Sequence, residues 1–436
     1  MIEPAGRLLA RVDRAAGGLA ADLVLYAGSG LFAVVTAATS TLLPHRAWGA
    51  IAAWGYAAAA ILVTGQMTVR WTRAQSAAGH GGVPAGRGLS AYAVDGTRVR
   101  AALGWLTGVA AALIPLVVEA VQRAGGRADR AQEEVLVVER MGARLVHDGT
   151  PYLGPEAIGA LPAGERLTAY SPYQPGMAIF GLPRAVTGDH WWTDARVWFA
   201  VVTVAALVAA VRLLPRTALR VRPIQAVSVL PICPLTLATG GDDLPVLALS
   251  LLALALSGAG RYGRAGLAVG AAAACKLFAL PVVAVLVVLA IATGHGRRLI
   301  PGAVGLPLAA LVPPVLIDPD AVVENVLRFP LGHGLVASPA QSPFPGRLIS
   351  QSLPGGRYLA AALLVTIAAA ITVRLVHRPP RNAAQAAAVI GWGLLAAILL
   401  MPTTRFGYLL YPAAFLAWAT AFRDPQQVHR NTSPAR

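Results

Sequence analysis

Cysteine and lysine are both scarce in this sequence of 436 residues, and each scarcity excludes something. The two cysteines, Cys233 and Cys275, lie in apolar runs, which argues against a disulfide framework and against a cysteine-based metal site. Both are expected to be buried as small hydrophobic side chains. A single lysine, Lys276, stands among 36 basic residues, so arginine supplies nearly all of the positive charge.

Signatures of the common cofactor-dependent enzymes are also missing. The sequence contains no Walker motif, no zinc-ligand spacing, no Rossmann glycine pattern and no serine-nucleophile elbow. It therefore gives no reason to assign a nucleotide, a dinucleotide or zinc, and no cofactor is certain. A divalent cation stays open, because Asp242 and Asp243 are adjacent carboxylates.

Charge is scarce as well: 13% of the residues are charged, 56% are hydrophobic, and the mean hydropathy is +0.62. Apolar runs of about 18 or more residues recur, and this is the length that a helix needs to cross a bilayer. Lipid offers the backbone no hydrogen-bond partner, so such runs must be helical. The sequence predicts an all-α, polytopic transmembrane helical bundle with about 11–13 membrane segments.

The formal net charge of +16 would suggest nucleic acid as a partner in a soluble protein. Here the positive-inside rule explains it better, and no nucleic acid is expected. Arg7, Arg11 and Arg14 precede the first apolar run, which is too long for a cleaved signal and predicts an uncleaved anchor. Placing both termini in the cytoplasm puts every short basic loop inside. The predicted location is the bacterial plasma membrane.

The apolar runs mark the expected membrane segments, and these divide the chain into three regions. The segments are residues 22–43, 48–69, 101–118, 195–214, 223–239, 244–257, 265–292, 299–317, 357–373, 383–400 and 407–422. The basic, glycine-rich residues 70–100 are expected to form a flexible linker. Residues 1–100 are then an N-terminal transmembrane hairpin with its cytoplasmic linker, residues 101–422 a transmembrane core, and residues 423–436 a disordered cytoplasmic tail.

The run of residues 265–292 is too short for two full spans, yet basic turns flank both of its ends. Because both ends should face the cytoplasm, the chain must leave and return within this run. A broken or re-entrant pair that turns near Lys276 and Pro281 fits, provided that protein covers its backbone.

One soluble-looking stretch, EEVLVVERMGARLVHDGTPYLGPEAIGALPAGERLTAYSPYQPGMAIFGLP, starts at Glu133 and lies on the extracytoplasmic side in this topology. Residues 133–147 have apolar side chains at helical spacing and should form a helix on the membrane surface. Glu133 and Glu134 then lie in its first turn, where the helix dipole favours carboxylates. These two and Glu139 are candidate catalytic carboxylates, although acidic residues in a first turn also belong to ordinary helix starts.

Two cations stand out in this topology. Lys276 lies inside the apolar run LAVGAAAACKLFALPVVAVL, where a charge costs roughly 2.5–3.5 kcal/mol. Either its side chain reaches the outer surface by snorkelling, or it contacts a lipid phosphate at a helix break. Arg405, in MPTTRFGYLLYP on the outer side, either anchors a loop or supplies a second cation for that phosphate.

Other polar residues on the outer side are candidates for substrate binding. Asp242 and Asp243 open a span, where they satisfy a helix N-terminus, coordinate a cation, or bind sugar hydroxyls. Tyr170 and Tyr173 lie in the turn-rich segment AYSPYQPGM, which either caps the bundle or forms an aromatic rim for a sugar. His333 lies in the loop of residues 318–351, which is expected to cover the site.

These pieces follow one another in a recognisable order: the acidic stretch, GARLVHDGTPY, AYSPYQPGMAIFGLP, GGDDLPVLALSLLALAL, RAGLAVGAAAACKLFALP and TTRFGYLLYP. In this order the chain resembles the GT-C superfamily of polytopic glycosyltransferases. Within it, the chain resembles the polyprenyl-phosphate-mannose-dependent mannosyltransferases of glycosyltransferase family 87. The resemblance covers roughly residues 101–422.

The resemblance implies a polyprenyl-phosphate-linked hexose donor, with mannose expected, a glycolipid or glycan acceptor in the cell envelope, and a direct, inverting transfer. A carboxylate in the first large outer loop would take the acceptor proton. The family usually has aspartate there, whereas this chain offers glutamates, of which Glu134 is best placed but about one residue out of register. Lys276 and Arg405 match positions that would hold the donor phosphate and stabilise its developing charge.

Two alternatives to an active transferase stay open on the sequence. A transporter or flippase of lipid-linked sugars would share the broken helix and the buried cation, although the inverted repeats common in transporters are not found. A catalytically inactive relative that serves as an assembly partner would account for the shifted glutamate.

Overall fold

The computed structural model describes residues 13, 15–79, 88–214 and 220–422. Within these ranges the chain is helical and forms no strand, and an isolated parallel bridge joins Gln341 to Thr404. The prediction of an all-α fold is confirmed. The predictions for Arg7, Arg11, Arg14 and the tail of residues 423–436 concern positions outside the described residues.

Seven helices in the described residues are long and apolar enough to cross a membrane, which confirms a polytopic helical bundle. They are formed by α2 (Leu19–Thr39), α3 (Leu43–Gly79), α4 and α5 (Gly88–Gly108 and Ile114–Ala124), α10 (Ala195–Leu213), α16 (Gly296–Ile317), α19 (Gly356–His377) and α20 (Ala383–Leu400). The pair α11 (Val221–Ser228) and α12 (Ile232–Thr239), bent by 40°, counts as one more. Three shorter apolar helices are α13 (Asp243–Gly258), α15 (Leu280–Ala292) and α21 (Leu410–Ala421).

The chain divides into two compact units: residues 1–119 with 216–239, and residues 120–215 with 240–436. In the first unit α2 packs along α3, and α4 packs against α11. Asp22 of α2 is buried and accepts hydrogen bonds from Arg100 of α4 (2.5 Å) and Arg222 of α11 (2.7 Å). The N-terminal hairpin is therefore tied by buried charge to segments that follow much later in the sequence.

Two predictions about the hairpin are wrong. The expected segments 22–43 and 48–69 place the turn at residues 44–47, whereas residues 40–42 form it and α3 begins at Leu43. Pro44 lies in the first turn of α3, where a proline costs no backbone hydrogen bond. The predicted flexible linker of residues 70–100 is largely helical, because α3 continues to Gly79 and α4 begins at Gly88. Residues 80–87 of that linker lie outside the described residues.

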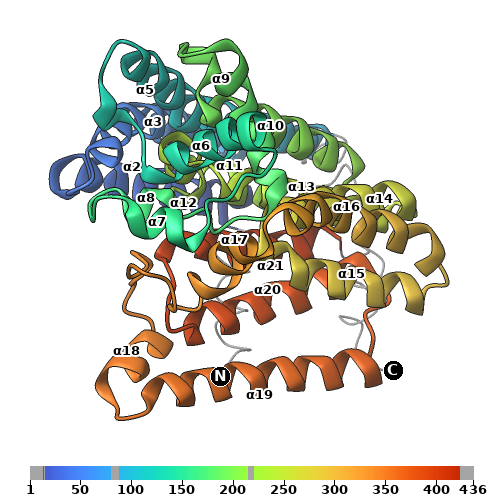
Figure 1. The fold of residues 1–436 in the computed structure, drawn as a ribbon. Helices are drawn as coiled ribbons and strands as arrows, with labels where there is room; N and C mark the ends of the chain where they lie inside the picture. Colours follow the sequence, from blue (N-terminus) through green and yellow to red (C-terminus); the bar gives the residue numbers. More distant parts are fainter. Residues whose placement is uncertain (1–12, 14, 80–87, 215–219, 423–436) are drawn as a thin grey trace. The chain divides into compact units, whose positions relative to one another are not determined.

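The second unit contains the remaining helices, and all of the candidate site residues lie in it. Within it, α10 packs along α13, α13 along α14 (Tyr262–Cys275), α14 along α16, and α20 along α21 (Figure 1). The shorter helices are α6 (Glu133–Asp148), α7 (Pro155–Ala160), α8 (Arg166–Ala169), α9 (Leu182–Thr187), α17 (Pro319–Val323) and α18 (Pro345–Ser352). Single helical turns include η4 (Pro175–Gly181), η7 (Leu277–Ala279), η8 (Glu324–Arg328) and η9 (Phe406–Leu409).

The helix predicted over residues 133–147 is confirmed as α6, with Glu133 and Glu134 in its first turn. Its apolar face does not lie free for lipid, however, because Val135, Val138 and Met141 are fully buried. This face packs on η4 and α9, where a Cβ atom on Gly142 would lie 2.3 Å from the carbonyl carbon of Gly181. Close backbone contact with the neighbouring turn thus replaces the expected membrane surface.

The predicted break near Lys276 is confirmed. Helix α14 ends at Cys275, Lys276 is extended (φ −154°, ψ 140°), and the chain resumes as η7 and α15. The break is covered by protein, since Lys276 is 7% exposed. The re-entrant path through the bilayer stays a prediction.

Helices α14 and α16 come closest where each has glycines, so that backbone packs directly against backbone. A Cβ atom on Gly302 of α16 would lie 2.7 Å from the Leu267 nitrogen of α14, whereas one on Gly305 would meet nothing within 4 Å. We expect Gly302→Ala to lower the free energy of unfolding by about 1–3 kcal/mol through overpacking. Gly305→Ala, one turn further along, should be neutral or stabilising by up to about 1 kcal/mol.

Thermal unfolding of both variants in detergent would check this pair, with the Gly302→Ala midpoint lower by several degrees. Equal midpoints for the two variants would contradict the close approach of these helices.

Candidate functional site

Lys276 forms a buried ion triad with the two adjacent aspartates. Its Nζ lies 2.6 Å from Asp242 Oδ2 and 2.6 Å from Asp243 Oδ1. Because the side chain is 8% exposed and neutralised inside the protein, the snorkelling interpretation is wrong. A buried lysine without such partners would be strongly disfavoured, so this triad is what permits a cation at this depth.

Aromatic side chains enclose the triad. The rings of Tyr173 and Tyr408 each lie 5.4 Å from Lys276 Nζ, within the range of cation–π attraction. The Tyr411 hydroxyl donates a hydrogen bond to Asp243 Oδ1 (2.8 Å). Phe278, two residues after the lysine, packs its ring against those of Tyr408 and Tyr411. The triad is thus held in a largely dehydrated, aromatic environment.

The turn-rich segment AYSPYQPGM covers the break in the helix. The Gln174 N–H donates to the Cys275 carbonyl (3.1 Å), which is left free because α14 ends there. A Cβ atom on Gly176 would lie 2.6 Å from the Ala274 carbonyl oxygen, so only glycine lets the segment approach this closely. This close packing places the ring of Tyr173 beside Lys276.

Glu134 and Arg405 form a second ion pair, 271 residues apart in sequence. Glu134 comes from the first turn of α6, and Arg405 directly precedes η9. The side chains are 15% and 37% exposed, so this pair is more open to solvent than the triad. Glu134 is therefore partly accessible to solvent, unlike the two aspartates of the triad.

The loop of residues 318–351 holds Arg405 in place from both sides. The Thr404 N–H donates to the Ala340 carbonyl (3.0 Å), and the Ser342 N–H donates to the Thr404 carbonyl (2.9 Å). The Phe406 N–H donates to Ser342 Oγ (2.9 Å). These bonds create the isolated bridge and fix the backbone on each side of the arginine.

Tyr408 connects the two charged groups. Its ring faces Lys276, while its N–H donates to the Arg405 carbonyl (3.1 Å). The structure therefore brings together most of the predicted site, namely Glu134, Lys276, Arg405, Tyr173, Asp242 and Asp243. With every group ionised, three carboxylates face two cations, so the region has a surplus of negative charge.

The aspartates do not act as helix caps. Asp242 is the N-cap residue of α13, but its side chain accepts no capping hydrogen bond and turns to Lys276 instead. In the described part of the chain, no group of three or more His, Cys, Asp or Glu side chains is arranged to hold a metal ion. In the structure the two carboxylates share the Lys276 ammonium group.

Glu139 lies in a different network from the other candidate carboxylates. Its carboxylate accepts from Arg123 (2.7 Å) and from the Ala195 N–H (3.2 Å), and it pairs with Arg184 (3.3 Å). Burial alone would raise the pKa of neighbouring Asp194, but Arg196 and Arg123 outweigh it and hold that pKa well below its usual range. These charged groups join α6 to the start of α10, so Glu139 has a structural role.

Tyr170, His333 and Glu133 are also not brought to the lysine. The Tyr170 hydroxyl donates to Glu324 (2.7 Å) and accepts from the Leu335 N–H (2.8 Å). Burial, helped by Glu324, raises the pKa of Tyr170 to about 12. Tyr170 thus anchors the loop that contains His333, whose side chain is exposed, and Glu133 is exposed without a side-chain partner among the described residues.

Tyr408, Tyr411 and Gln174 were not among the predicted site residues. The two tyrosines could have been predicted to lie on one face, because they are three residues apart at the start of a helical run. Gln174 acts through its backbone N–H, for which the side chain gives no signal.

Comparison with known proteins gives a match to one family model. Residues 171–402 match the model described as Glycosyltransferase family 87, which is more than half of the chain. The match includes the triad of Asp242, Asp243 and Lys276, begins after α6, and ends just before Arg405. No curated protein and no solved structure matches the chain.

Glu139→Gln should destabilise the fold rather than act on chemistry. Breaking a buried ion pair costs about 3–5 kcal/mol, and this is an upper bound here, because Arg123 loses one of its two carboxylate partners and keeps Asp194. Glu133→Gln, six residues earlier on the same helix and exposed, should change stability by less than about 0.5 kcal/mol. Thermal unfolding of the two variants measures the difference, and similar stability for both would refute the structural role of Glu139.

Proposed function

This chain belongs to glycosyltransferase family 87, and on that basis we propose that it transfers a hexose from a polyprenyl-phosphate-linked donor. Mannose is the sugar we propose, and the acceptor is a glycolipid or glycan of the cell envelope. The observation that carries the proposal is the ion pair between Glu134 and Arg405 beside the Lys276 triad. It joins a candidate base to a candidate phosphate-binding cation.

The proposed site faces the extracytoplasmic side of the bacterial plasma membrane, with both termini in the cytoplasm. The positive-inside rule supports this orientation, because the short loops rich in arginine then face the cytoplasm. A membrane-embedded donor fits a chain whose described residues include seven helices long and apolar enough to span, since its prenyl chain needs lipid around it.

In the proposed reaction, Arg405 changes partner. It pairs with Glu134 in the structure, and it would turn to the donor phosphate when the donor binds. Glu134 would then be free to accept the proton of the acceptor hydroxyl as that oxygen attacks the anomeric carbon. The charge that develops on the departing polyprenyl phosphate is met by Arg405, whose planar guanidinium binds phosphate oxygens in pairs.

Lys276 supports the same phosphate without leaving its triad. A lysine ammonium group has three N–H donors, and two of them are used by Asp242 and Asp243. The third is available to a phosphate oxygen. The two aspartates, fixed by the lysine and by Tyr411, offer remaining oxygen lone pairs to sugar hydroxyls, next to the ring of Tyr173.

Glu134→Gln should abolish sugar transfer while leaving the protein folded. The amide keeps the shape of the side chain but cannot accept a proton, so the rate should fall by about 10²–10⁴-fold. Glu133→Gln is the matched control, because it lies one residue earlier, has the same chemistry and contacts no partner in the described structure. The assay follows radiolabelled mannose from polyprenyl phosphate to a membrane acceptor in reconstituted vesicles.

Full activity of Glu134→Gln would overturn its role as the base. Transport of the labelled donor across the vesicle membrane without formation of a glycosidic bond would instead support a flippase. A wild-type chain inactive with every lipid-linked hexose would support an inactive assembly partner.

Arg405→Gln should lower transfer by about 10²–10³-fold, the size of effect expected when one charge-stabilising group is removed. Because the arginine and Glu134 act on the same reaction step, the double variant should be little worse than Glu134→Gln alone. Arg374→Gln, an exposed arginine in the last turn of α19, serves as the control. Losses in the double variant equal to the product of the two single losses would contradict the exchange of partners.

A further inference from the structure

A second cluster of cations lies at the other end of α14, away from the lysine. Arg261 directly precedes α14 and Arg264 lies in its first turn, while Arg297 and Arg298 lie in the first turn of the adjacent α16. All four side chains are exposed, and none of them has a hydrogen-bond or ion-pair partner among the described residues. We call these four residues the arginine cluster.

The position of the arginine cluster is electrostatically unfavourable in the protein alone. The start of a helix has a partial positive charge, so cations are disfavoured there and anions are favoured. The cluster adds four positive charges to the starts of two neighbouring helices, and no carboxylate offsets them in the described structure. Two helix starts and four guanidinium groups together are suited to binding a phosphate anion.

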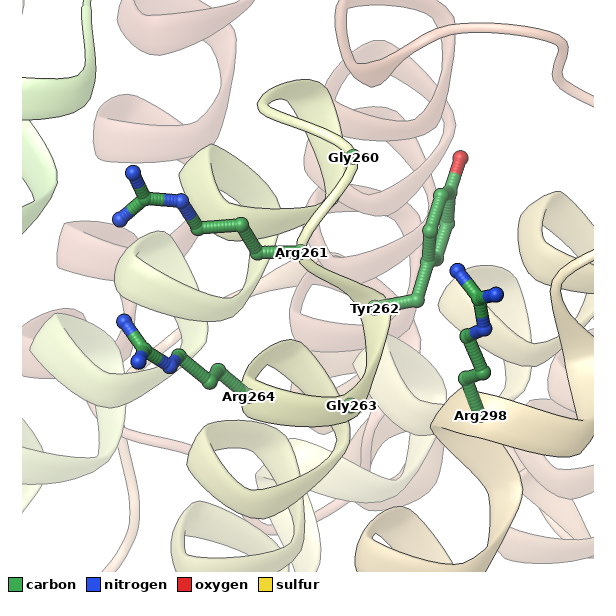
Figure 2. Close-up of a pocket in the computed structure, with 6 residues that line it drawn as sticks. All are labelled: Gly260, Arg261, Tyr262, Gly263, Arg264 and Arg298. Carbon is green, nitrogen blue, oxygen red and sulfur yellow. The ribbon is translucent and has the colours of Figure 1, made fainter.

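A cavity of about 490 Å³ lies at this point, lined by Gly260, Arg261, Tyr262, Gly263, Arg264 and Arg298. Its wall is rigid at Tyr262, whose ring stacks on His295 (4.3 Å between centroids) and whose hydroxyl lies 3.0 Å from Thr293 Oγ1. Figure 2 shows the guanidinium groups of Arg261 and Arg264 on one side of the turn, with Tyr262 and Arg298 on the other.

A second cavity, of about 740 Å³, is lined by Ile291, Gly294, Gly296, Arg297, Ile300 and Pro301. Arg298 lines the first cavity and Arg297, the residue before it in α16, lines the second. Ile291, which is 61% exposed, presents an alkyl surface here. A ligand that fits both cavities has an anionic end and an alkyl chain.

We propose that the arginine cluster binds the phosphate headgroup of an anionic phospholipid, with an acyl chain in the second cavity, beside Ile291. This lipid is distinct from the sugar donor, because the 14 residues of α14 separate the cluster from Lys276 by about 20 Å. The proposal rests on charge and shape at this end of the helices and is independent of the proposed transferase activity. The positive-inside rule places the cluster in the cytoplasmic leaflet, which is rich in anionic lipids.

The test compares two triple variants of the full chain, purified and placed in phosphatidylcholine nanodiscs with increasing phosphatidylglycerol. The first, Arg261→Gln with Arg264→Gln and Arg298→Gln, removes the charge that lines the first cavity. The second, Arg374→Gln with Arg378→Gln and Arg381→Gln, makes the same charge change at exposed positions in the last turn of α19 and just after it, also predicted to be cytoplasmic. Bound phosphatidylglycerol is counted by native mass spectrometry after release from the nanodisc.

We expect the first variant to lose about 10- to 100-fold in affinity for phosphatidylglycerol, while the second stays within a factor of two of the unchanged chain. Ile291→Gln should also weaken lipid binding and leave binding of inorganic phosphate unchanged. Equal losses in the two triple variants would overturn the proposal in favour of general surface charge. Competition by inorganic phosphate as effective as that by the lipid would overturn the acyl-chain part.

Discussion

The second unit depends on how it accommodates one buried ammonium group. Lys276 is stable in an apolar run because Asp242 and Asp243 neutralise it and aromatic rings surround it. Its neutralising partners come from the start of α13, and the rings come from the segment before η4 and from η9. One charge thus determines where three parts of the chain must meet, and leaving any of its partners out would expose an uncompensated charge to an apolar interior.

The charged groups of the site differ in how tightly they are held. The triad is buried, whereas the pair of Glu134 and Arg405 is partly exposed, and in the proposed reaction this pair exchanges its partners. Such a division suits group transfer, because one set of charges must stay fixed to define the geometry while another must respond to substrate. Membership of glycosyltransferase family 87 gives this arrangement a chemical context.

The sequence was informative wherever chemistry is local. The break at Lys276 follows from a charge and a proline within one apolar run, and α6 follows from its spacing of valines. The pairing of Glu134 with Arg405 could not be predicted, since 271 residues separate them and neither position shows a pattern that depends on the other. The sequence offers Glu134 and Glu139 as equal candidates in one helix. The ion pair of Glu139 with Arg123, which the structure shows, indicates that Glu139 has a structural role.

The bridge between Gln341 and Thr404 couples the loop of residues 318–351 to Arg405. Hydrogen bonds from residues 340–342 hold the chain immediately before and after Arg405, so a displacement of the loop would also displace the backbone of the arginine. Tyr170 holds the same loop at Leu335. A substrate that displaced this loop on entering would therefore also draw the guanidinium away from Glu134, and binding would change the charge distribution at the site.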